Sequence, residues 1–396
     1  MKNTRLFVGS CLVAMASLAF AQDQPAPGAQ APAPAPAAPP APTWSIGPID
    51  FSGMIDGYYT FNFNHPFPTS PPTTNLSTGG GNQLYNFNVN SQQFSLGMAK
   101  LTMSHDADPL GFRVDLGFGK AFDIIHFAEP SGASFLRNIE QAYVSMKNKK
   151  GFELDAGQFV TSAGAEVIES KDNWNYSRSI LFSWAIPYYH FGVRAILPVS
   201  SHFTAGVQLV NGWNNTEDNN TGKTLVFVGN VTTKKLTWSN NYITGPENTN
   251  SNKGFRNLYD TTVLFTPSDK FNAYINYDYG RNAQCGKCLV FPGSGSAHWT
   301  GIAGAAHFQL NNWFALSPRY EFFNDADGFQ TVAAPGHLQE FTITAEAKAS
   351  QGVMTRLEYR RDWSESDNFF QKGLGRFSDH QDTITLAIIA FFGPKH

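Results

Sequence analysis

Apolar and polar residues alternate one by one between residues 338 and 348. Phe341 and Ile343 fall on one side of this alternation, whereas Glu340 and Thr342 fall on the other. Successive side chains of an extended strand point to opposite faces, so a period of two predicts a β-strand with one apolar and one polar face. The following segment, residues 353–360, repeats the pattern and predicts a second strand of the same kind.

The alternation recurs along most of the chain after residue 48. Roughly sixteen such segments of about 10 residues can be counted, and that length lets a tilted strand cross a bilayer. The pattern is blurred near 222–231, 234–243 and 255–266, so fourteen or eighteen strands also fit the sequence. The clearest further segments are 49–63, 112–118, 203–209, 271–279, 314–322 and 383–392.

The predicted strands are joined alternately by long and by short connections. Connections that differ in this way at the two ends are typical of an up-and-down barrel in a bacterial outer membrane, with long extracellular loops and short periplasmic turns. An even number of strands brings both termini to the side of the short turns. The long connections are expected near 64–91, 121–137, 161–187, 213–221, 244–254, 282–296, 324–337 and 363–378.

The distribution of charge separates a membrane barrel from a soluble β-sandwich, which also alternates. Arg, Glu and Asp recur on the polar face of strand after strand, while the other face is apolar and aromatic. A barrel with a wet interior needs this distribution, because the lipid side must be apolar and every backbone group must be paired. The sequence therefore predicts an all-β fold, a transmembrane antiparallel β-barrel of about 16 strands.

The N-terminal residues predict export. Lys2 and Arg5 precede an apolar stretch, and Ala19-Phe20-Ala21 matches a cleavage site, so residues 1–21 are expected to be a signal peptide. Residues 22–45, rich in Pro and Ala, are expected to form an extended periplasmic tether. Residues 46–396 are then the barrel, and the protein is expected in the bacterial outer membrane.

Composition excludes several other classes of protein. The formal net charge is −3, and it becomes −5 when Lys2 and Arg5 are removed, which argues against a nucleic-acid partner. Outside the signal peptide only Cys285 and Cys288 remain, and their spacing fits a local disulfide or an idle thiol pair. The histidines show no metal-ligand spacing and no nucleotide fingerprint occurs, so neither a metal nor a cofactor is expected.

The long connection 161–187 is both apolar and charged, unlike a solvated surface loop. Folded into a wide barrel, it would narrow the pore and set its acids against basic wall residues, which would select solutes by charge. The alternative is that the same charges form structural ion pairs with the wall. The candidate pore-lining or constriction residues are Arg113, Asp115, Glu166, Glu169, Asp172, Arg178, Arg194, Arg319, Glu321, Arg356, Glu358 and Arg360.

Several motifs make the chain similar to a known family. The runs 164–170, 173–179 and 187–194, the Asn-Gly-Trp-Asn motif at 211–214 and the Asp-Gly-Tyr-Tyr motif at 56–59 resemble the OmpL-like β-barrel porins. The resemblance covers nearly all of the chain after the tether and implies an outer-membrane barrel that acts as a porin. It transfers no established pore residue. The residues that follow Phe392 depart from the usual aromatic end of such barrels.

The expected function is passive diffusion of small hydrophilic solutes or ions, because sixteen strands leave room for an aqueous channel. The alternative hypothesis is a barrel that acts as a surface-binding or adhesion protein, or as a lipid- or peptide-hydrolysing enzyme. Of these functions we do not expect the enzymatic one. The expected partners are outer-membrane lipid, the permeating solutes and the barrel-assembly machinery. A homotrimer is compatible with a barrel of this size.

Overall fold

The computed structural model describes residues 44–67, 81–127, 129, 136–283, 295–331, 336–350 and 352–394. The expected signal peptide and nearly all of the expected tether lie outside these residues, as do Cys285 and Cys288. Export and the state of the two thiols therefore stay predictions.

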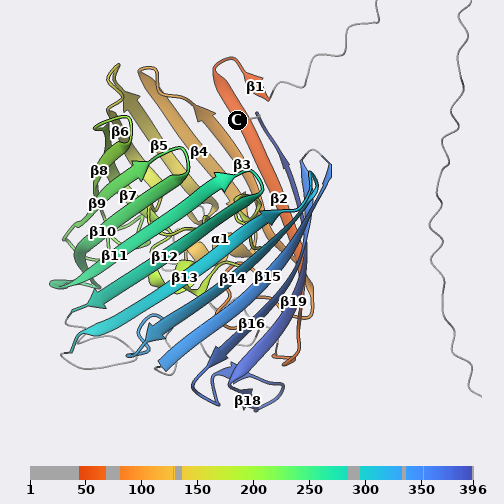
Figure 1. The fold of residues 1–396 in the computed structure, drawn as a ribbon. Helices are drawn as coiled ribbons and strands as arrows, with labels where there is room; N and C mark the ends of the chain where they lie inside the picture. Colours follow the sequence, from red (N-terminus) through yellow and green to blue (C-terminus); the bar gives the residue numbers. More distant parts are fainter. Residues whose placement is uncertain are drawn as a thin grey trace, which may run out of the picture. The chain divides into compact units, whose positions relative to one another are not determined.

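Sixteen antiparallel strands form a closed barrel, which confirms the predicted fold class (Figure 1). Each strand pairs with the next, and the last pairs with the first, where Ile384 faces Phe61. Closure removes the free sheet edges that a membrane does not tolerate. The strands are β2 (Ile49–Asn62), β3 (Phe94–His105), β4 (Leu110–Phe118), β5 (Ile139–Lys147), β6 (Glu153–Val160), β7 (Tyr189–Pro198), β8 (Phe203–Val210), β9 (Thr224–Thr232), β10 (Leu236–Asn248), β11 (Ser251–Ser268), β12 (Phe271–Asn282), β13 (Ala297–Gln309), β14 (Phe314–Asp325), β15 (Gly336–Ser350), β16 (Val353–Ser364) and β19 (His380–Phe392).

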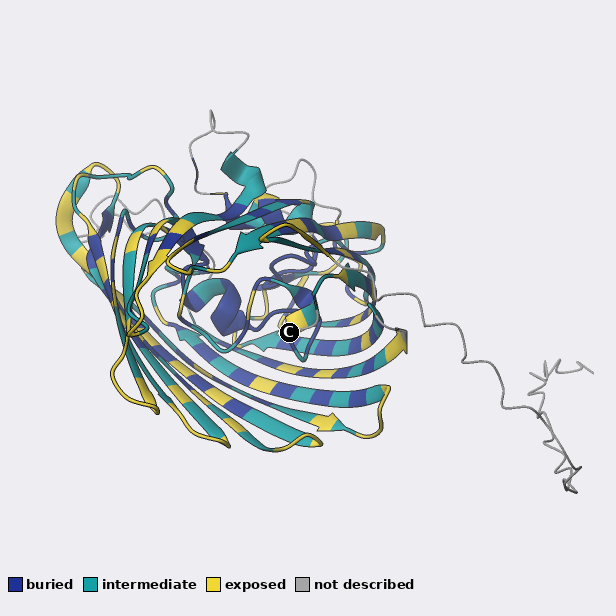
Figure 2. Cartoon of the chain, turned by 90° about the horizontal axis from the view of Figure 1, so that it is seen from above, coloured by how far each residue is buried: buried dark blue, intermediate teal, exposed yellow. Residues whose placement is uncertain are grey.

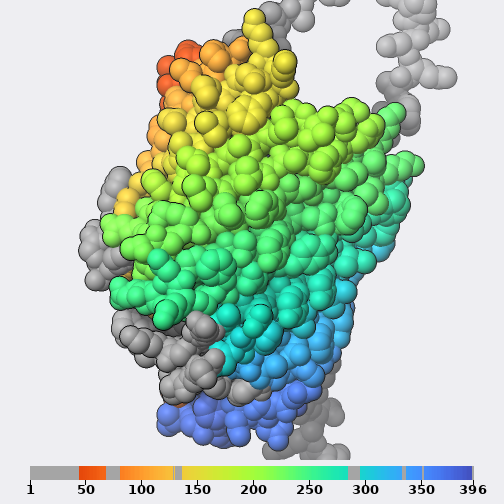
Figure 3. Space-filling view, turned by 90° about the vertical axis from the view of Figure 1, so that its left-hand side faces the viewer, coloured from red at the N-terminus to blue at the C-terminus, as the bar shows by residue number. Residues whose placement is uncertain are grey.

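Consecutive strands lie side by side as slanting bands on the barrel surface (Figure 3). Their connections alternate between short and long, as predicted, with one exception. The prediction of a long connection at 244–254 is wrong. Strand β10 extends to Asn248 and β11 already begins at Ser251, so a short turn joins them. Asn250, which takes a φ of 58° in this tight turn, belongs to a residue type that tolerates the left-handed conformation.

The two faces of the barrel wall differ as the alternation predicted. Buried and exposed residues alternate along the strands (Figure 2), and large apolar side chains such as Leu386 and Ile275 are among the exposed ones. The buried wall residues include many polar and charged ones, for example Asp155 and Thr342, each 0% exposed. An apolar exterior around a polar interior is the reverse of a soluble protein and fits a barrel surrounded by lipid.

The described residues hold further regular elements before β2 and in the connections. These are β1 (Ser45–Ile46), which pairs with β2, the helices α1 (Lys120–Ile125), η1 (Leu136–Asn138), η2 (Ser170–Asp172) and η3 (Leu181–Ala185), and the hairpin of β17 (Phe370–Gln371) and β18 (Phe377–Ser378). Among the described residues, the helices are all too short to cross a membrane.

Candidate functional site

The connection between β6 and β7, residues 161–188, contacts the barrel wall on several sides. Ser162 donates from its hydroxyl to Asn241 of β10 at 2.7 Å. The main-chain N–H of Ala165 donates to Asn276 of β12 at 3.3 Å. Further along, Asn175 donates from its side chain to the carbonyl of Ser317 on β14 at 2.9 Å. Polar groups of three different wall strands, β10, β12 and β14, thus contact one connection.

Wall carboxylates bind main-chain N–H groups of this connection. Glu358 of β16 accepts hydrogen bonds from the N–H of Tyr176 at 2.6 Å and of Ser177 at 3.0 Å. Glu321 of β14 accepts from the N–H of Ile180 at 2.7 Å. Since this segment is irregular, its N–H groups lack secondary-structure partners, and these carboxylates satisfy them.

Wall arginines bind carbonyl groups of the same connection. Arg356 donates to the carbonyl of Ser170 at 2.5 Å, and Arg360 donates to that of Arg178 at 2.7 Å. Arg319 donates to the carbonyl of Ser177 at 2.7 Å. All three wall arginines are at most 1% exposed.

Each of these arginines also has a carboxylate partner. Arg319 lies 2.6 Å from Glu166 of the connection and 2.5 Å from Glu340 of β15. Glu340 lies 3.1 Å from Arg360 as well, and Arg356 lies 2.7 Å from Glu346 of β15. A buried charge is tolerated where it is both paired and hydrogen-bonded, which is the case here.

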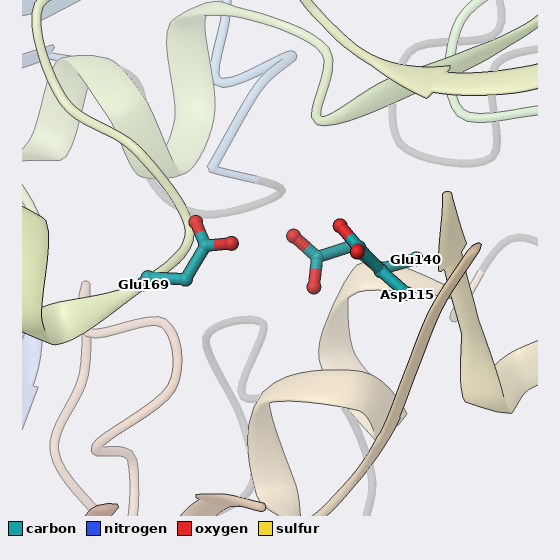
Figure 4. Close-up of side chains that lie close together, drawn as sticks. All are labelled: Asp115, Glu140 and Glu169. Carbon is teal, nitrogen blue, oxygen red and sulfur yellow. The ribbon is translucent and has the colours of Figure 1, made fainter. Parts of the chain in front are cut away.

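A lysine joins the connection to another part of the wall. The ammonium of Lys100 on β3 lies 3.0 Å from Asp115 of β4 and 3.0 Å from Glu140 of β5, and it also contacts Glu169 of the connection. Figure 4 shows the three carboxylates, and one oxygen of each lies within 4.8 Å of one oxygen of the other two. The ammonium supplies the positive charge that such a group of acids requires.

A register irregularity explains why Glu140 joins this cluster. Asp115 pairs with Gln141 and Leu116 pairs with Ile139, so Glu140 is the extra residue of a β-bulge. A bulge redirects a side chain relative to the regular alternation. Sequence alternation alone therefore misses Glu140.

Beside β7 and β8 the inward face is lined by small and polar residues. Arg194 of β7, with an 18% exposed side chain, lies 2.6 Å from Asp155 of β6 and over the rings of Tyr143 and Phe159. A cavity of about 120 Å³ adjoins it. Its lining includes Ser162, Arg194, Thr204, Gln208 and Asn230.

The remaining predicted site residues contact groups close to them in the chain. Arg113 is 37% exposed and lies 3.0 Å from Asp115. Asp172 is exposed and pairs with its neighbour Lys171. Arg178 donates to the carbonyl of Val167 at 3.1 Å, within its own connection.

Sequence reasoning missed several residues that complete the site. Lys100 stands on the polar face of its strand, and Asp56 accepts the Tyr176 hydroxyl at 2.6 Å. Glu340 and Glu346 lie directly across from Asp362 and Arg356 in the pairing of β15 with β16. Charge on the inward face of a predicted strand was the available signal for all of them.

The match to a family model decides the wider identity of the chain. Residues 48–392 match the model described as "Putative beta-barrel porin-2, OmpL-like". The chain belongs to this family. It is therefore an outer-membrane porin by family. The resemblance noted in the sequence is confirmed, and the family supports the expected location in the bacterial outer membrane. A search of curated protein sequences gives no match.

Solved structures similar to this porin share its fold. The anion-selective porin from Comamonas acidovorans has 10% identity and a TM-score of 0.57 over 87% of this chain and 99% of the other. The outer membrane channel DcaP of Acinetobacter baumannii has 11% identity and a TM-score of 0.56 over 87% and 97%. Salmonella typhi OmpF, in complex with daunomycin, has 10% identity and a TM-score of 0.56 over 87% and 97%. At such identities the likeness concerns architecture.

Proposed function

We propose that this porin lets small hydrophilic solutes or ions diffuse passively through its barrel, and that the connection 161–188 narrows the passage. The observation that supports this most is the set of hydrogen bonds that the connection donates to acceptors on β10, β12, β14 and β16. A segment bound to several strands around the barrel wall can reduce the open cross-section of the pore. The protein acts as a channel and not as an enzyme.

We propose that solutes pass between the connection and the wall formed by β6 to β9. The arginine anchors of β14 and β16 are at most 1% exposed, so that side of the barrel is filled by packed protein. The cavity beside Arg194 and the small lining residue Gly206 lie on the opposite, less filled side. Arg194 and Arg113 are the partly exposed cations that passing solutes would meet, and their partners Asp155 and Asp115 offset part of their charge.

Conductance of the refolded protein in a planar bilayer tests the channel. We expect discrete openings whose size scales with salt concentration, as for a water-filled pore. Protein that is demonstrably folded, because its gel mobility changes on heating, and yet gives no conductance would contradict the proposal. A binding or adhesion role for the long connections would then be the better explanation.

A variant without residues 164–184 tests the narrowing. The deletion removes most main-chain contacts to β14 and β16 while both ends of the connection remain, and we expect a larger unit conductance. Folding of this variant is checked by the same heat-dependent gel mobility. A folded variant with unchanged conductance would show that the connection does not limit flow.

The proposed partners follow from the membrane setting. The exposed apolar belt suits outer-membrane lipid, and insertion would require the barrel-assembly machinery and export by the N-terminal signal. Vibrio cholerae OmpT, similar in fold at 11% identity and a TM-score of 0.54, is described in a trimer form. We propose a homotrimer for this porin too, which mass measurement in a mild detergent tests.

A further inference from the structure

The cavity of about 120 Å³ beside Arg194 is lined by residues of β7, β8 and β9 and by Ser162 of the connection 161–188. One water molecule needs only about 10–15 Å³ of such space, so the cavity has room for a small solute. Its wall residues form three successive rows of cross-strand partners, of which the first is polar, the second apolar and the third polar. The rows are Arg194 with Gln208, Ile196 with Gly206 and Val228, and Thr204 with Asn230.

The guanidinium of Arg194 is held in place while two of its nitrogens remain available. Its Nε donates to Asp155 at 2.6 Å, and the group lies over the rings of Tyr143 and Phe159, at 5.1 and 4.6 Å from their centres. Among the described residues, none accepts a hydrogen bond from the two terminal nitrogens. A guanidinium presents its donors in a rigid fork that matches a carboxylate, so these nitrogens are preorganised for such a group.

The amide of Gln208 offers an acceptor in the same row. Ser162 donates its hydroxyl proton to Asn241 at 2.7 Å, so the Ser162 oxygen accepts from Nε2 of Gln208 at 3.2 Å. With the amide in this orientation, no group of the described residues donates to Oε1 of Gln208, although the residue is only 4% exposed. A buried oxygen without a donor is costly, which points to a ligand that donates there.

We propose that this cavity binds small α-hydroxy or α-amino carboxylates. The carboxylate of the solute accepts from the terminal nitrogens of Arg194. The hydroxyl or ammonium on the neighbouring carbon donates to Oε1 of Gln208, because the two side chains are cross-strand partners that start only about 5 Å apart. The short carbon chain of the solute then lies over the apolar row of Ile196, Gly206 and Val228.

Weak binding at this site suits transport, and that role rests on the proposed function. Asp155 already offsets part of the charge of Arg194, so a bound carboxylate gains less than it would from an unpaired cation. A solute in a channel must bind well enough to enter and weakly enough to leave. We therefore expect dissociation constants in the millimolar range.

Saturation-transfer NMR on the refolded full chain in detergent tests the binding without requiring conduction. Lactate carries both recognised groups, propionate lacks the hydroxyl, and lactamide lacks the carboxylate. We expect lactate to bind about fivefold more tightly than propionate, the contribution of one hydrogen bond between neutral groups. Lactamide should bind roughly tenfold or more weakly than lactate, because it loses the charged contact.

Two substitutions separate the two contacts. Arg194→Gln should weaken the binding of lactate and of propionate alike, roughly tenfold or more, whereas Gln208→Leu should weaken that of lactate alone, to the level of propionate. Gln141→Leu is the matched control and should leave both affinities unchanged. Gln141 is also buried, at 5% exposure, but it donates to Asp115 at 2.7 Å and lies outside the cavity lining.

Equal binding of lactate and propionate by the wild type would overturn the proposal, and this comparison needs no variant to fold. Unchanged lactate binding by Arg194→Gln would also overturn it, since the solute would then bind elsewhere. A protein that conducts but binds neither acid would refute the site and leave the channel intact. The expected binding pattern in a folded protein that does not conduct would refute the channel and support the site.

Discussion

Arg194 of β7 donates from Nε to a carboxylate oxygen of Asp155 on β6 at 2.6 Å. The two residues are direct register partners, so the pair lies on one inward row of the wall. The arginine side chain remains 18% exposed while the aspartate side chain is fully buried, so the positive partner is the more accessible one on the proposed path of the ions.

Replacing Arg194 by Gln should shift ion selectivity toward cations. The substitution leaves the Asp155 carboxylate without its partner next to the cavity of about 120 Å³, so the local potential becomes more negative. The reversal potential in a salt gradient measures the change. Arg361→Gln is the matched control, since Arg361 is also ion-paired across a strand register but lies outside the inward row. Equal reversal potentials for both variants would place Arg194 outside the conduction path.

Replacing Arg356 by Met should loosen the connection 161–188 and raise current noise. The guanidinium holds the carbonyl groups of Ser170 and Asn173, and its loss also leaves Glu346 buried and unpaired. Removing one partner of a buried pair costs about 3–5 kcal/mol, whereas removing both is often tolerated. The double variant Arg356→Met/Glu346→Met should therefore regain stability in urea unfolding but keep the noisy conductance. If the current noise of the double variant equals that of the wild type, the arginine does not anchor the connection.

Replacing Lys100 by Met should destabilise the barrel strongly. Asp115, Glu140 and Glu169 then lose the ammonium that lies among them, and three carboxylates remain close together. We expect a loss on the order of 3–5 kcal/mol in unfolding experiments, as for a broken buried pair. Lys147→Met, which breaks the exposed pair with Glu153 at 3.1 Å, should cost less than about 1 kcal/mol.

Acid should break the ion pair between Lys100 and Glu169. Burial acts to raise the pKa of Glu169, but the Lys100 ammonium outweighs it and the pKa lies below its usual value. Because the pKa is lowered in the folded protein, the ionised group stabilises the fold at pH values above the ordinary Glu pKa of about 4.3. This stability is lost as the pH falls through the pKa of the folded state. Stability of the wild type should therefore drop below about pH 4, and Glu169→Gln should flatten that drop. A slope unaffected by this substitution would assign the acid sensitivity to other carboxyls.

The fold was largely predictable because alternation reports directly on a two-faced wall. The alternation was less clear in strands that also carry polar residues on the outer face. One example is the Tyr259 hydroxyl of β11, which donates to Asn240 of β10 at 2.9 Å. The same ambiguity hid the tight turn after Asn248, since polar turn-forming residues occur in loops and in extended strand ends alike.

The site was less predictable because contacts inside a barrel join residues far apart in the chain. The connection 161–188 and its charged neighbours could be selected from composition, but not the pairing of Glu169 with Lys100 or of Glu358 with the N–H groups of Tyr176 and Ser177. Those partners depend on the closure of the ring and on strand register. The bulge that brings Glu140 inward leaves no periodic signal at all.

Replacing Leu386 by Arg should test which face of the wall meets lipid. Leu386 of β19 is 50% exposed and pairs with Leu357 and Tyr59 in the apolar outer row. An arginine facing lipid near the middle of a bilayer costs about 2–4 kcal/mol, and the cost falls toward the interfaces. We expect such a loss when the variant unfolds from lipid vesicles, and a smaller one for Phe392→Arg at the end of the same strand. Equal effects at both positions, or none at Leu386, would mean that this face is covered by protein, as at a contact between copies of the chain.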